Sequence, residues 1–326
     1  MFFSLIIPVY NRPEEIRVVL EGLSQQTYKN FEVIIVEDGS VDKSEDIVES
    51  FKDQLNVHYY YIDNIGQGFA RNYGFKQSKG DYVIILDSDI IIPEFYLEKI
   101  HRHLQKEPLD CFGGPDRAHP AFSPLQKAID YALTSYLTTG GIRGSSHSVS
   151  RFYPRSFNMG IKREVYEKTG GFNMPDWGED LEFSMRIEQA GFKIGLIKDA
   201  FVYHIRRPSL KAFFIQMVRI GKSRINIARL FPGSTKAVHL IPLLAYLYIL
   251  LTLIFLFTAP ALARAMIAVV LLYLMGVILE SFFRHRSLAV SFLCLLTSPS
   301  VFFGYGWGLM RYSFKQKGIY IRGKKA

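Results

Sequence analysis

The sequence predicts an α/β domain with a parallel, doubly wound sheet, followed by C-terminal transmembrane helices. Short apolar strands alternate with helical stretches in the first part of the chain, which is typical of a parallel sheet covered on both faces. Charged residues then nearly vanish between Ala237 and Met310. That region holds three apolar segments, and a membrane-spanning helix needs roughly 20 such residues.

Each element of the α/β domain follows from its local pattern. Apolar runs predict early strands at residues 4–9, 32–37, 57–62 and 82–86. Helical spacing predicts helices at residues 14–24, 42–51, 68–77, 93–104, 161–168 and 180–190. Late strands are expected at 192–197 and 201–204. Residues 110–160 are rich in glycine and include the Ser/His run 144–150, which favours a long mobile loop.

We expect four parts along the chain. They are a catalytic domain at 1–207, an interfacial amphipathic helix region at 208–236, a membrane anchor at 237–312 and a basic tail at 313–326. The anchor segments are expected at about 240–257, 265–283 and 288–310. If the catalytic domain lies in the cytoplasm, three full crossings place the basic tail outside the cell. Basic residues tend instead to lie on the cytoplasmic side of a membrane. One resolution is that the third segment re-enters, turning at Ser298-Pro299-Ser300, and the sequence leaves both spanning and re-entry open.

The formal net charge of +9 indicates an anionic partner, such as lipid or nucleic acid. Basic residues cluster on both sides of the apolar region, which favours anionic lipid over nucleic acid. The two cysteines, Cys111 and Cys294, lie in different parts of the chain and have no metal-type spacing, so we expect neither a disulfide nor a cysteine-bound metal. The N-terminal apolar run lacks a basic region and a cleavage site, so we interpret it as a strand.

Polar residues that follow the predicted strands are candidates for a site, because ligands bind at the carboxyl ends of parallel strands. Asp87 and Asp89 flank Ser88 directly after residues 82–86, and alternate side chains point the same way. A divalent cation with diphosphate oxygens would hold two such carboxylates together. A plain polar turn has the same pattern, so the motif alone leaves both open.

Four further stretches suggest chemistry, and each has a structural alternative. Asp38 could accept a hydrogen bond from a nucleotide base or belong to a capped turn. Gly66, Gly68 and Arg71 open a helix, which suits phosphate, although this glycine spacing is common. His204 could be a third metal contact or a structural histidine. In the Glu179-Asp180 pair, a carboxylate could act as a general base or cap a helix.

Taken together, these motifs resemble the family 2 glycosyltransferases. The matching stretches are residues 4–12 (SLIIPVYNR), 36–40 (VEDGS), 66–74 (GQGFARNYG), 87–89 (DSD), 157–172 (FNMGIKREVYEKTGGF), 178–180 (GED) and 202–204 (VYH). They occur in order over about the first 205 residues. The resemblance implies the GT-A fold, a Rossmann-like sheet that binds a nucleotide-sugar, together with an inverting mechanism and Mg²⁺ or Mn²⁺.

The resemblance also implies a role for each motif residue. The nucleotide-sugar site would comprise Pro8, Tyr10, Arg12, Asp38, Gly68, Arg71, Asp87 and Ser88. The metal site would comprise Asp89, Asp87 and His204. Asp180 would be the catalytic base, and Glu179 would help to place the acceptor. Apart from the resemblance, we expect Asp116, in the loop 110–156, and Trp177, just before Glu179, to face the acceptor. The acceptor site would also include Gln216 and Arg219. The last two lie in a stretch similar to the Q-x-x-R-W signature of processive synthases, which departs from it at Ile220.

The expected function is transfer of one sugar from a nucleotide-diphosphate sugar to a hydroxyl of a lipid-linked glycan, in cell-surface polysaccharide or glycolipid synthesis. A UDP-sugar is favoured as the donor and a GDP-sugar is possible. One alternative is transfer to a polyprenyl phosphate, and another is a non-catalytic membrane scaffold of the same fold. The expected location is the cytoplasmic membrane, with several crossings and with the catalytic domain facing the cytoplasm. Membrane lipids are expected partners and nucleic acid is not.

Overall fold

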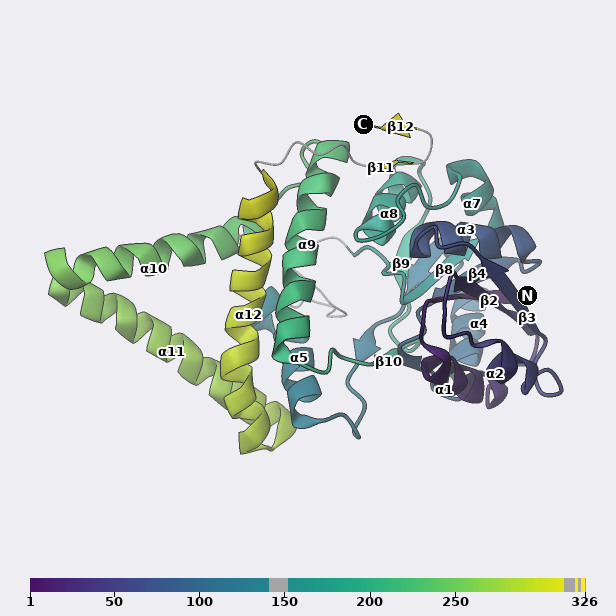
Figure 1. The fold of residues 1–326 in the computed structure, drawn as a ribbon, viewed down its shortest axis with the longest axis horizontal. Helices are drawn as coiled ribbons and strands as arrows, with labels where there is room; N and C mark the ends of the chain where they lie inside the picture. The colour runs from purple at the N-terminus through teal and green to yellow at the C-terminus, as the bar shows by residue number, and fades with distance from the viewer. Residues whose placement is uncertain (141–151, 314–319, 322–323, 326) are drawn as a thin grey trace. The chain divides into compact units, whose positions relative to one another are not determined.

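The computed structural model describes residues 1–140, 152–313, 320–321 and 324–325 (Figure 1). It divides into two compact units, which we describe separately. The α/β unit comprises residues 1–119, 150–205 and 319–326, and the helical unit comprises residues 120–149 and 206–318. The Ser/His run 144–150 and most of the predicted tail lie outside the described residues. The helical unit includes residues 120–149, which the sequence assigns to the first domain.

A seven-stranded sheet, in the order β3-β2-β1-β4-β8-β6-β9, forms the centre of the α/β unit. Its first four strands are parallel, as predicted: β1 (Phe3–Val9), β2 (Phe31–Asp38), β3 (Val57–Ile62) and β4 (Tyr82–Leu86). Successive residues of β1 enter opposite cores, with Leu5 and Ile7 in one cluster and Ile6 in the other. The sheet is therefore buried on both faces.

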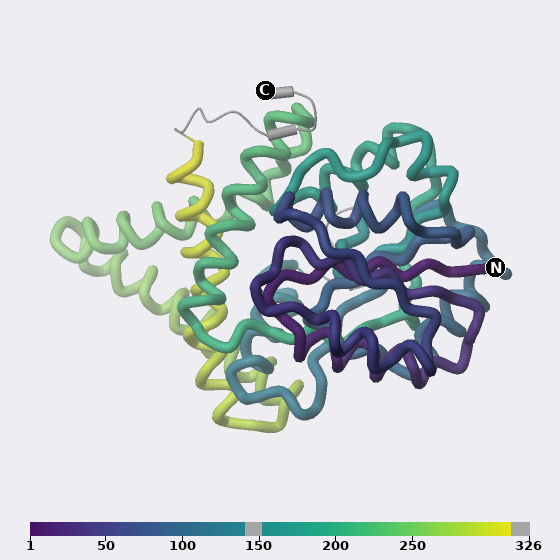
Figure 2. The backbone as a smooth tube through the Cα atoms, turned by 45° about the vertical axis from the view of Figure 1, so that its right-hand side comes forward, coloured from purple at the N-terminus to yellow at the C-terminus, as the bar shows by residue number. Residues whose placement is uncertain are grey.

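Helices cover each face of this sheet. One core includes side chains of α1 (Pro13–Ser24), α2 (Glu45–Glu49) and α4 (Tyr96–Lys106). The other includes side chains of α3 (Gln67–Gln77), α7 (Arg163–Thr169) and α8 (Glu179–Gln189). Figure 2 shows the purple helix α1 and the blue helix α3 on opposite sides of the strands. The doubly wound architecture predicted from the sequence is confirmed.

The second half of the sheet is mixed, which the sequence did not predict. β8 (Asn158–Lys162) runs antiparallel to both β4 and β6 (Cys111–Gly113), and β9 (Ile194–Leu196) is parallel to β6. The predicted start of a helix at residue 161 was wrong, because Ile161 and Lys162 still pair with β4. Gly160 lies under the Phe112 ring, where a Cβ would come within 1.9 Å of the ring.

A second, three-stranded sheet positions the candidate site. β10 (Val202–His204) lies between β5 (Ile90–Ile91) and β7 (Asp116–Arg117). In this register His204 is opposite Ile90, and Val202 is opposite Asp116. The late strand thus returns to the Asp87-Ser88-Asp89 segment at the end of β4. The short strands β11 (Tyr320–Ile321) and β12 (Lys324–Lys325) pair with each other.

The described part of the helical unit contains α5, α6, α9, η1, α10, α11 and α12. Their bounds are α5 (Pro124–Thr134), α6 (Tyr136–Thr139), α9 (Leu210–Leu230), η1 (Ala237–Leu240), α10 (Ile241–Thr258), α11 (Pro260–His285) and α12 (Leu288–Ser313). The prediction of a mobile loop was wrong at α5, which begins in a capping box formed by Ser123 and Gln126. Helix α5 packs against α11 and α12.

Three stretches, Ala237–Thr258, Pro260–His285 and Leu288–Ser313, are long and apolar enough to cross a membrane. The predicted turn at Ser298-Pro299-Ser300 was wrong, because α12 continues through Pro299 as one helix. The Ser300 hydroxyl donates to the Leu296 carbonyl, 2.7 Å away, within the same turn.

Candidate active site

Two aspartates and a histidine converge at the end of β4. Asp87, Asp89 and His204 each offer a ligand atom, and these atoms lie within 4.8 Å of one another. The Nε2 atom of His204 is 3.0 Å from Oδ1 of Asp89. Two carboxylates and an imidazole fit a divalent cation, because Mg²⁺ and Mn²⁺ prefer oxygen ligands and imidazole is a common metal ligand. The three predicted metal ligands therefore lie together.

Asp116 lies next to this cluster, on the far side of the His204 ring from Asp89. Its Oδ2 is 3.9 Å from Nδ1 of His204, and the side chain is buried. The His204 ring also stacks on Phe157, with centroids 5.0 Å apart. A carboxylate behind a ligating histidine orients the ring and raises its basicity. Asp116 thus lies beside His204 in the structure, and its contact with the acceptor stays a prediction.

Arg12 and Ser88 lie at the edge of the same cluster. A guanidinium nitrogen of Arg12 is 3.2 Å from Asp89 and 3.0 Å from Glu15. The Ser88 hydroxyl also donates to Glu15, over 3.1 Å. Both residues were predicted to bind the nucleotide-sugar, but here Arg12 balances the charge of Asp89. Glu15 was missed, although its position three residues after Arg12 on a helix could have identified it.

Arg71 joins the aspartate cluster to the Glu179-Asp180 pair. One of its terminal nitrogens is 2.7 Å from Asp87 and the other is 2.8 Å from Glu179. Only 1% of the Arg71 side chain is exposed. The sequence predicted that this guanidinium would pair with a phosphate. In the structure it instead holds two carboxylates, from β4 and α8, in fixed positions.

The Glu179-Asp180 pair occupies the first turn of α8, as predicted. The chain reaches it through Trp177 and Gly178, both with positive φ, and this turn directs the two carboxylates. Glu179 is buried and accepts hydrogen bonds from Arg71, Gln67 and Ser156. Burial and the neighbouring Asp180 raise the pKa of Glu179 to about 7, against the opposing effect of Arg71.

Asp180 is more accessible than its neighbour and has a cation beside it. Its Oδ2 is 3.6 Å from a guanidinium nitrogen of Arg155. Its other oxygen accepts the Leu181 N–H at 2.7 Å. Arg155 was missed, because it lies in a loop where no spacing rule connects it to Asp180. Trp177 is half-buried beside this pair in the sequence, and its acceptor role stays a prediction.

The predicted nucleotide residues lie at the ends of β1 and β2. Both carboxylate oxygens of Asp38 accept backbone N–H groups, from Ile65 at 2.8 Å and Gly66 at 3.0 Å. Asp38 therefore fixes the segment leading into α3, and each oxygen retains one lone pair for a ligand. Pro8 is buried within β1, whereas 52% of Tyr10 is exposed directly after the strand. The Tyr10 ring is thus available for stacking.

Gly68 does not offer the phosphate cradle predicted from the sequence. Its N–H donates to the Pro175 carbonyl at 2.8 Å. A Cβ at this position would lie 2.1 Å from the Met174 carbonyl oxygen. The glycine therefore allows α3 to approach the loop before α8, which is a packing role.

Gln216 and Arg219 lie on α9 of the helical unit. Gln216 is half-buried and Arg219 is exposed. Their proposed contact with the acceptor stays a prediction.

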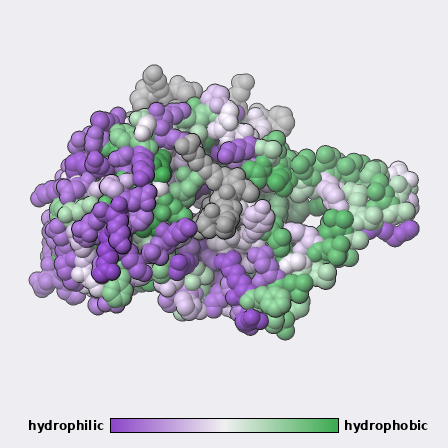
Figure 3. Space-filling view, turned by 180° about the vertical axis from the view of Figure 1, so that it is seen from behind, coloured by the Kyte–Doolittle hydropathy of each residue, from purple (hydrophilic) through white to green (hydrophobic). Residues whose placement is uncertain are grey.

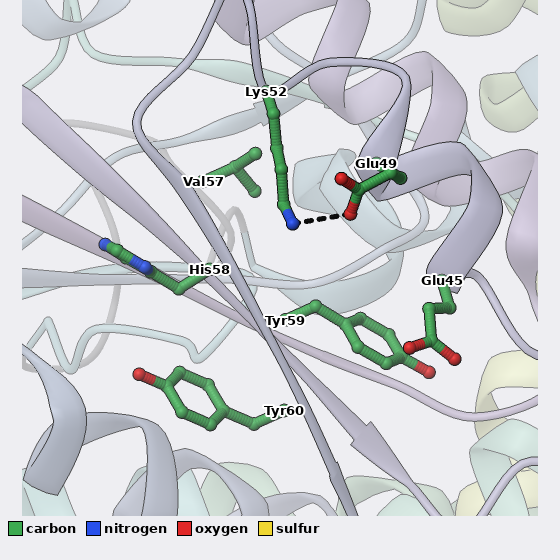
Figure 4. A pocket seen from close by; sticks show the side chains of 7 residues that line it. All are labelled: Glu45, Glu49, Lys52, Val57, His58, Tyr59 and Tyr60. Carbon is green, nitrogen blue, oxygen red and sulfur yellow. Dashed lines mark ion pairs between the residues drawn. The ribbon is translucent and has the colours of Figure 1, made fainter.

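A shallow pocket occurs elsewhere in the α/β unit, beside the edge strand β3 (Figure 4). Its lining residues are Glu45, Glu49, Lys52, Val57, His58, Tyr59 and Tyr60. Figure 4 shows Lys52 pointing toward Glu49, its ion-pair partner at 2.5 Å. None of the predicted site residues lines this pocket, so it makes a useful location for control substitutions.

Comparison with known proteins identifies relatives of this chain. The family model described as "Glycosyl transferase family 2" matches residues 4–170. Glycosyltransferase AglE of Haloferax volcanii is 28% identical over 233 residues, covering 69% of this chain and 74% of AglE. Glycosyltransferase GlyG of Streptococcus pneumoniae is 36% identical over 113 residues, covering 34% of this chain and 38% of GlyG. The chain thus matches less than two fifths of the length of GlyG.

A solved structure shares the fold. The mannosyltransferase PcManGT from Pyrobaculum calidifontis, in complex with GDP-Man and Mn²⁺, has a TM-score of 0.57 at 18% identity. The match covers 92% of this chain and 87% of that protein. This likeness supports the predicted GT-A fold. With a family model that spans half of its length, and with the aspartate and Glu-Asp motifs gathered in one unit, the chain belongs to glycosyl transferase family 2.

Proposed function

We propose that this protein transfers one sugar, with inversion, from a nucleotide-diphosphate sugar to a hydroxyl of a lipid-linked glycan. The reaction would serve the synthesis of a cell-surface polysaccharide or glycolipid. The enzyme would be anchored in the cytoplasmic membrane by its apolar C-terminal helices, with the α/β unit facing the cytoplasm. Divisions near residues 207, 236 and 312 would separate the catalytic, interfacial, anchoring and tail segments.

One observation carries the proposal: Arg71 connects a metal-type cluster to a carboxylate pair. Asp87 binds one side of the guanidinium and Glu179 binds the other. A donor diphosphate beside Asp87 and Asp89, and an acceptor beside Asp180, would therefore be held by one rigid set of residues. Such fixed positioning is a large part of what an enzyme contributes to a reaction between two substrates.

The transfer step requires a base on the acceptor side. The acceptor oxygen would attack the anomeric carbon as the bond from that carbon to the diphosphate oxygen breaks. The hydroxyl proton would pass to the Asp180 carboxylate, and the bonding electrons would leave with the diphosphate. Attack opposite the leaving group inverts the anomeric configuration, through a transition state of oxocarbenium character. Asp180 suits this role because it is the more accessible carboxylate of the pair.

The residues of the cluster fit the cofactor that the family implies. Asp87, Asp89 and His204 would hold Mg²⁺ or Mn²⁺, and Asp116 would orient His204. The bound ion would stabilise negative charge on the departing diphosphate. A protein of the same fold was solved with GDP-Man and Mn²⁺, so the fold accommodates this combination. We favour a UDP-sugar for this chain on the motif resemblance, with a GDP-sugar as the other candidate.

A second acceptor class is favoured by a specific contact. The Arg155 guanidinium lies 3.6 Å from Asp180, and a cation at this position would attract an anionic acceptor such as a polyprenyl phosphate. A phosphate oxygen is already ionised and needs no base. Substitution of Asp180 separates the two candidates, because only hydroxyl acceptors depend on its carboxylate.

The proposed metal site can be tested by titrating activity with Mg²⁺ or Mn²⁺ after treatment with a chelator. Hydrolysis or transfer of the donor should cease without metal and return on its addition. His204→Ala should raise the metal concentration for half-maximal activity by at least about 10-fold, because loss of a ligand costs no less than loss of an outer-shell partner. A panel of UDP- and GDP-sugars in the same assay identifies the donor.

His58→Ala is the matched control for this test. His58 lies on β3 in the pocket of Figure 4 and belongs to no part of the proposed site. Its metal response should equal that of the unmodified protein. Full activity in the chelated protein, or an unchanged metal requirement in His204→Ala, would count against the proposed metal site.

A further inference from the structure

Helix α12 differs from the other two apolar helices in what surrounds it. In the apolar segment of each helix that is long enough to cross a membrane, 39% of the residues of α12 are buried. The corresponding shares are 6% for Ala237–Thr258, which includes α10, and 11% for α11. In its first half, the Thr297 hydroxyl donates to the Ala128 carbonyl of α5 at 3.0 Å. In its second half, Gly304 and Gly308 face α9. The two helices pack so closely there that a Cβ on Gly308 would lie 2.2 Å from the Val218 carbonyl oxygen. Two amphipathic helices that also carry charged residues, α5 and α9, therefore line α12.

The first of these helices carries buried charges. Asp130 of α5 binds Arg206 at 2.6 Å and Arg284 at 3.4 Å. Glu280 of α11 accepts hydrogen bonds from the Tyr131 and Ser135 hydroxyls. This network fixes the end of α11 against α5, close to the start of α12. Charge networks of this kind are costly inside the hydrocarbon layer.

The second helix carries exposed charges alongside α12. Phe214 lies against Gly304 and Val218 against Gly308, so α9 and α12 run in the same direction. Lys222 places its ammonium 4.8 Å from the ring centroid of Tyr312. The basic residues Lys211, Arg219 and Lys222 of α9 are exposed. If α12 crossed the bilayer, the start of α9 would lie near its middle, because Lys211 precedes the Gly304 contact by about one turn.

That arrangement is unfavourable. A lysine or arginine at the centre of a bilayer costs at least about 2.5–3.5 kcal/mol. Long side chains near helix ends can reach the interface, but those in the middle cannot reach it easily. A depth at which the ionised side chains of α9 remain hydrated avoids this cost.

Helices α10 and α11 have the opposite character. Most of their large side chains are exposed and apolar, including Leu250, Leu253, Phe257 and Leu271. Figure 3 shows this apolar surface as the green projection. At about 1.5 Å per residue, α10 is about 27 Å long and α11 about 39 Å, close to the ~30 Å hydrocarbon thickness. Both are long enough to cross a bilayer.

The two helices leave α12 near opposite ends and meet at Ala259 (Figure 1). The Tyr246 hydroxyl of α10 donates to the Phe303 carbonyl at 2.8 Å. Val277 of α11 clusters with Val290 at the other end of α12. A helix that joins the two bases of a hairpin lies across the hairpin rather than along it.

We propose that α10 and α11 cross the bilayer as a hairpin, and that α12 does not cross. Helix α12 lies in the near headgroup layer, together with α5 and α9. Both ends of α12, the α/β unit and the basic tail are then on one side of the membrane. Arg264, exposed one turn beyond Ala259, lies at the far headgroup layer.

This topology also resolves the conflict with the positive-inside tendency. Two crossings return the chain to its starting side, so no turn is needed at Ser298-Pro299-Ser300. Arg284, in the last turn of α11, and Arg286, between α11 and α12, lie on the same side as the tail. The proposal concerns membrane topology alone, so it stands or fails independently of the sugar-transfer reaction.

Single-cysteine labelling in the full chain tests the proposal. The four variants are Asp53→Cys in the α/β unit, Thr258→Cys at the hairpin tip, and Ala289→Cys and Ser313→Cys at the two ends of α12. All four positions are exposed, whereas the native Cys111 and Cys294 are buried. A membrane-impermeant maleimide is added to sealed vesicles, before and after permeabilisation. We expect positions 53, 289 and 313 to label from one side and position 258 from the other.

The positions 289 and 313 form the deciding pair. Labelling of Ala289→Cys and Ser313→Cys from opposite sides would show that α12 crosses, and would overturn the proposal. Labelling of Thr258→Cys from the side of Asp53→Cys would show that the hairpin does not cross, with the same consequence. Leu288→Cys, also exposed, repeats the measurement if Ala289→Cys fails to accumulate. Permeabilised vesicles report the total labelling of each variant.

Discussion

Asp180→Asn is expected to lower the rate of sugar transfer about 10²–10⁴-fold, the usual contribution of a general base. The amide has nearly the shape of the carboxylate but cannot take a proton from the acceptor hydroxyl. Asp180 is the accessible member of the pair, whereas Glu179 is buried against Arg71. The donor should still bind, because the Asp180 carboxylate pairs with the Leu181 N–H and with Arg155, away from Asp87 and Asp89. Steady-state transfer and nucleotide affinity are measured on the same preparation.

Asp199→Asn is the matched control, because Asp199 is an exposed carboxylate of the same unit outside the site. It should leave both transfer and nucleotide affinity unchanged. Near-normal transfer to a hydroxyl acceptor by Asp180→Asn would refute the base assignment. If transfer to a polyprenyl phosphate persisted in Asp180→Asn while hydroxyl acceptors were inactive or absent, the second acceptor class would be correct.

The strands, the motifs at their ends and the start of α8 could be predicted, because each has a signal in the local sequence. Short runs rich in apolar and aromatic residues, bounded by polar residues, mark the parallel strands, and β3 and β4 begin and end at the predicted residues. The motif residues Asp87, Asp89 and His204 could be grouped, because strand ends meet at one edge of a sheet. The Glu179-Asp180 pair was expected at the start of a helix and is found there.

The remaining features depend on contacts between distant segments. β8 is a strand because it pairs with β4 and β6 across long sequence separations, and this pairing includes Ile161 and Lys162, which were predicted to be helical. Arg71 was expected to face a phosphate, but its partners come from β4 and α8. Arg155 lies in a loop, and only the folded chain brings it to Asp180. Hydropathy identified α12 but could not show that α5 and α9 cover it.

Arg71→Gln is expected to lower the free energy of unfolding by about 3–5 kcal/mol, the usual effect of removing one partner from a buried ion pair. The substitution leaves Asp87 and Glu179 without their shared cation, and Glu179 is only 4% exposed. Transfer activity should also fall, because Asp87 loses the group that holds it in the cluster. Chemical unfolding of the full chain in detergent, followed by tryptophan fluorescence, measures the change in stability.

Two further variants test whether the loss of stability in Arg71→Gln comes from the buried ion pairs rather than from removing any arginine. Arg102→Gln removes an exposed arginine that pairs with Glu98 on the surface of α4, so its effect should stay within about 0.5 kcal/mol. Arg71→Gln combined with Glu179→Gln removes one of the two stranded charges and should regain part of the stability without regaining activity. Equal stability of Arg71→Gln and Arg102→Gln would contradict the bridging role.

The pH dependence of Arg71→Gln gives an independent readout, because Glu179 has a raised pKa in the folded protein. The contribution of the Glu179 carboxyl to folding stability is fully present below the pKa that Glu179 has in the unfolded chain. It is lost as the pH rises through the folded-state pKa of about 7. Arg71 opposes that rise, so its removal raises the folded pKa further and extends the loss to higher pH. The difference in free energy of unfolding between the unmodified protein and Arg71→Gln should therefore grow above about pH 7. When Glu179→Gln is added to Arg71→Gln, the titrating carboxyl is gone, and the part of this growth that Glu179 causes should disappear. A deficit that is constant from acidic to alkaline pH would show that the buried carboxylate does not depend on Arg71.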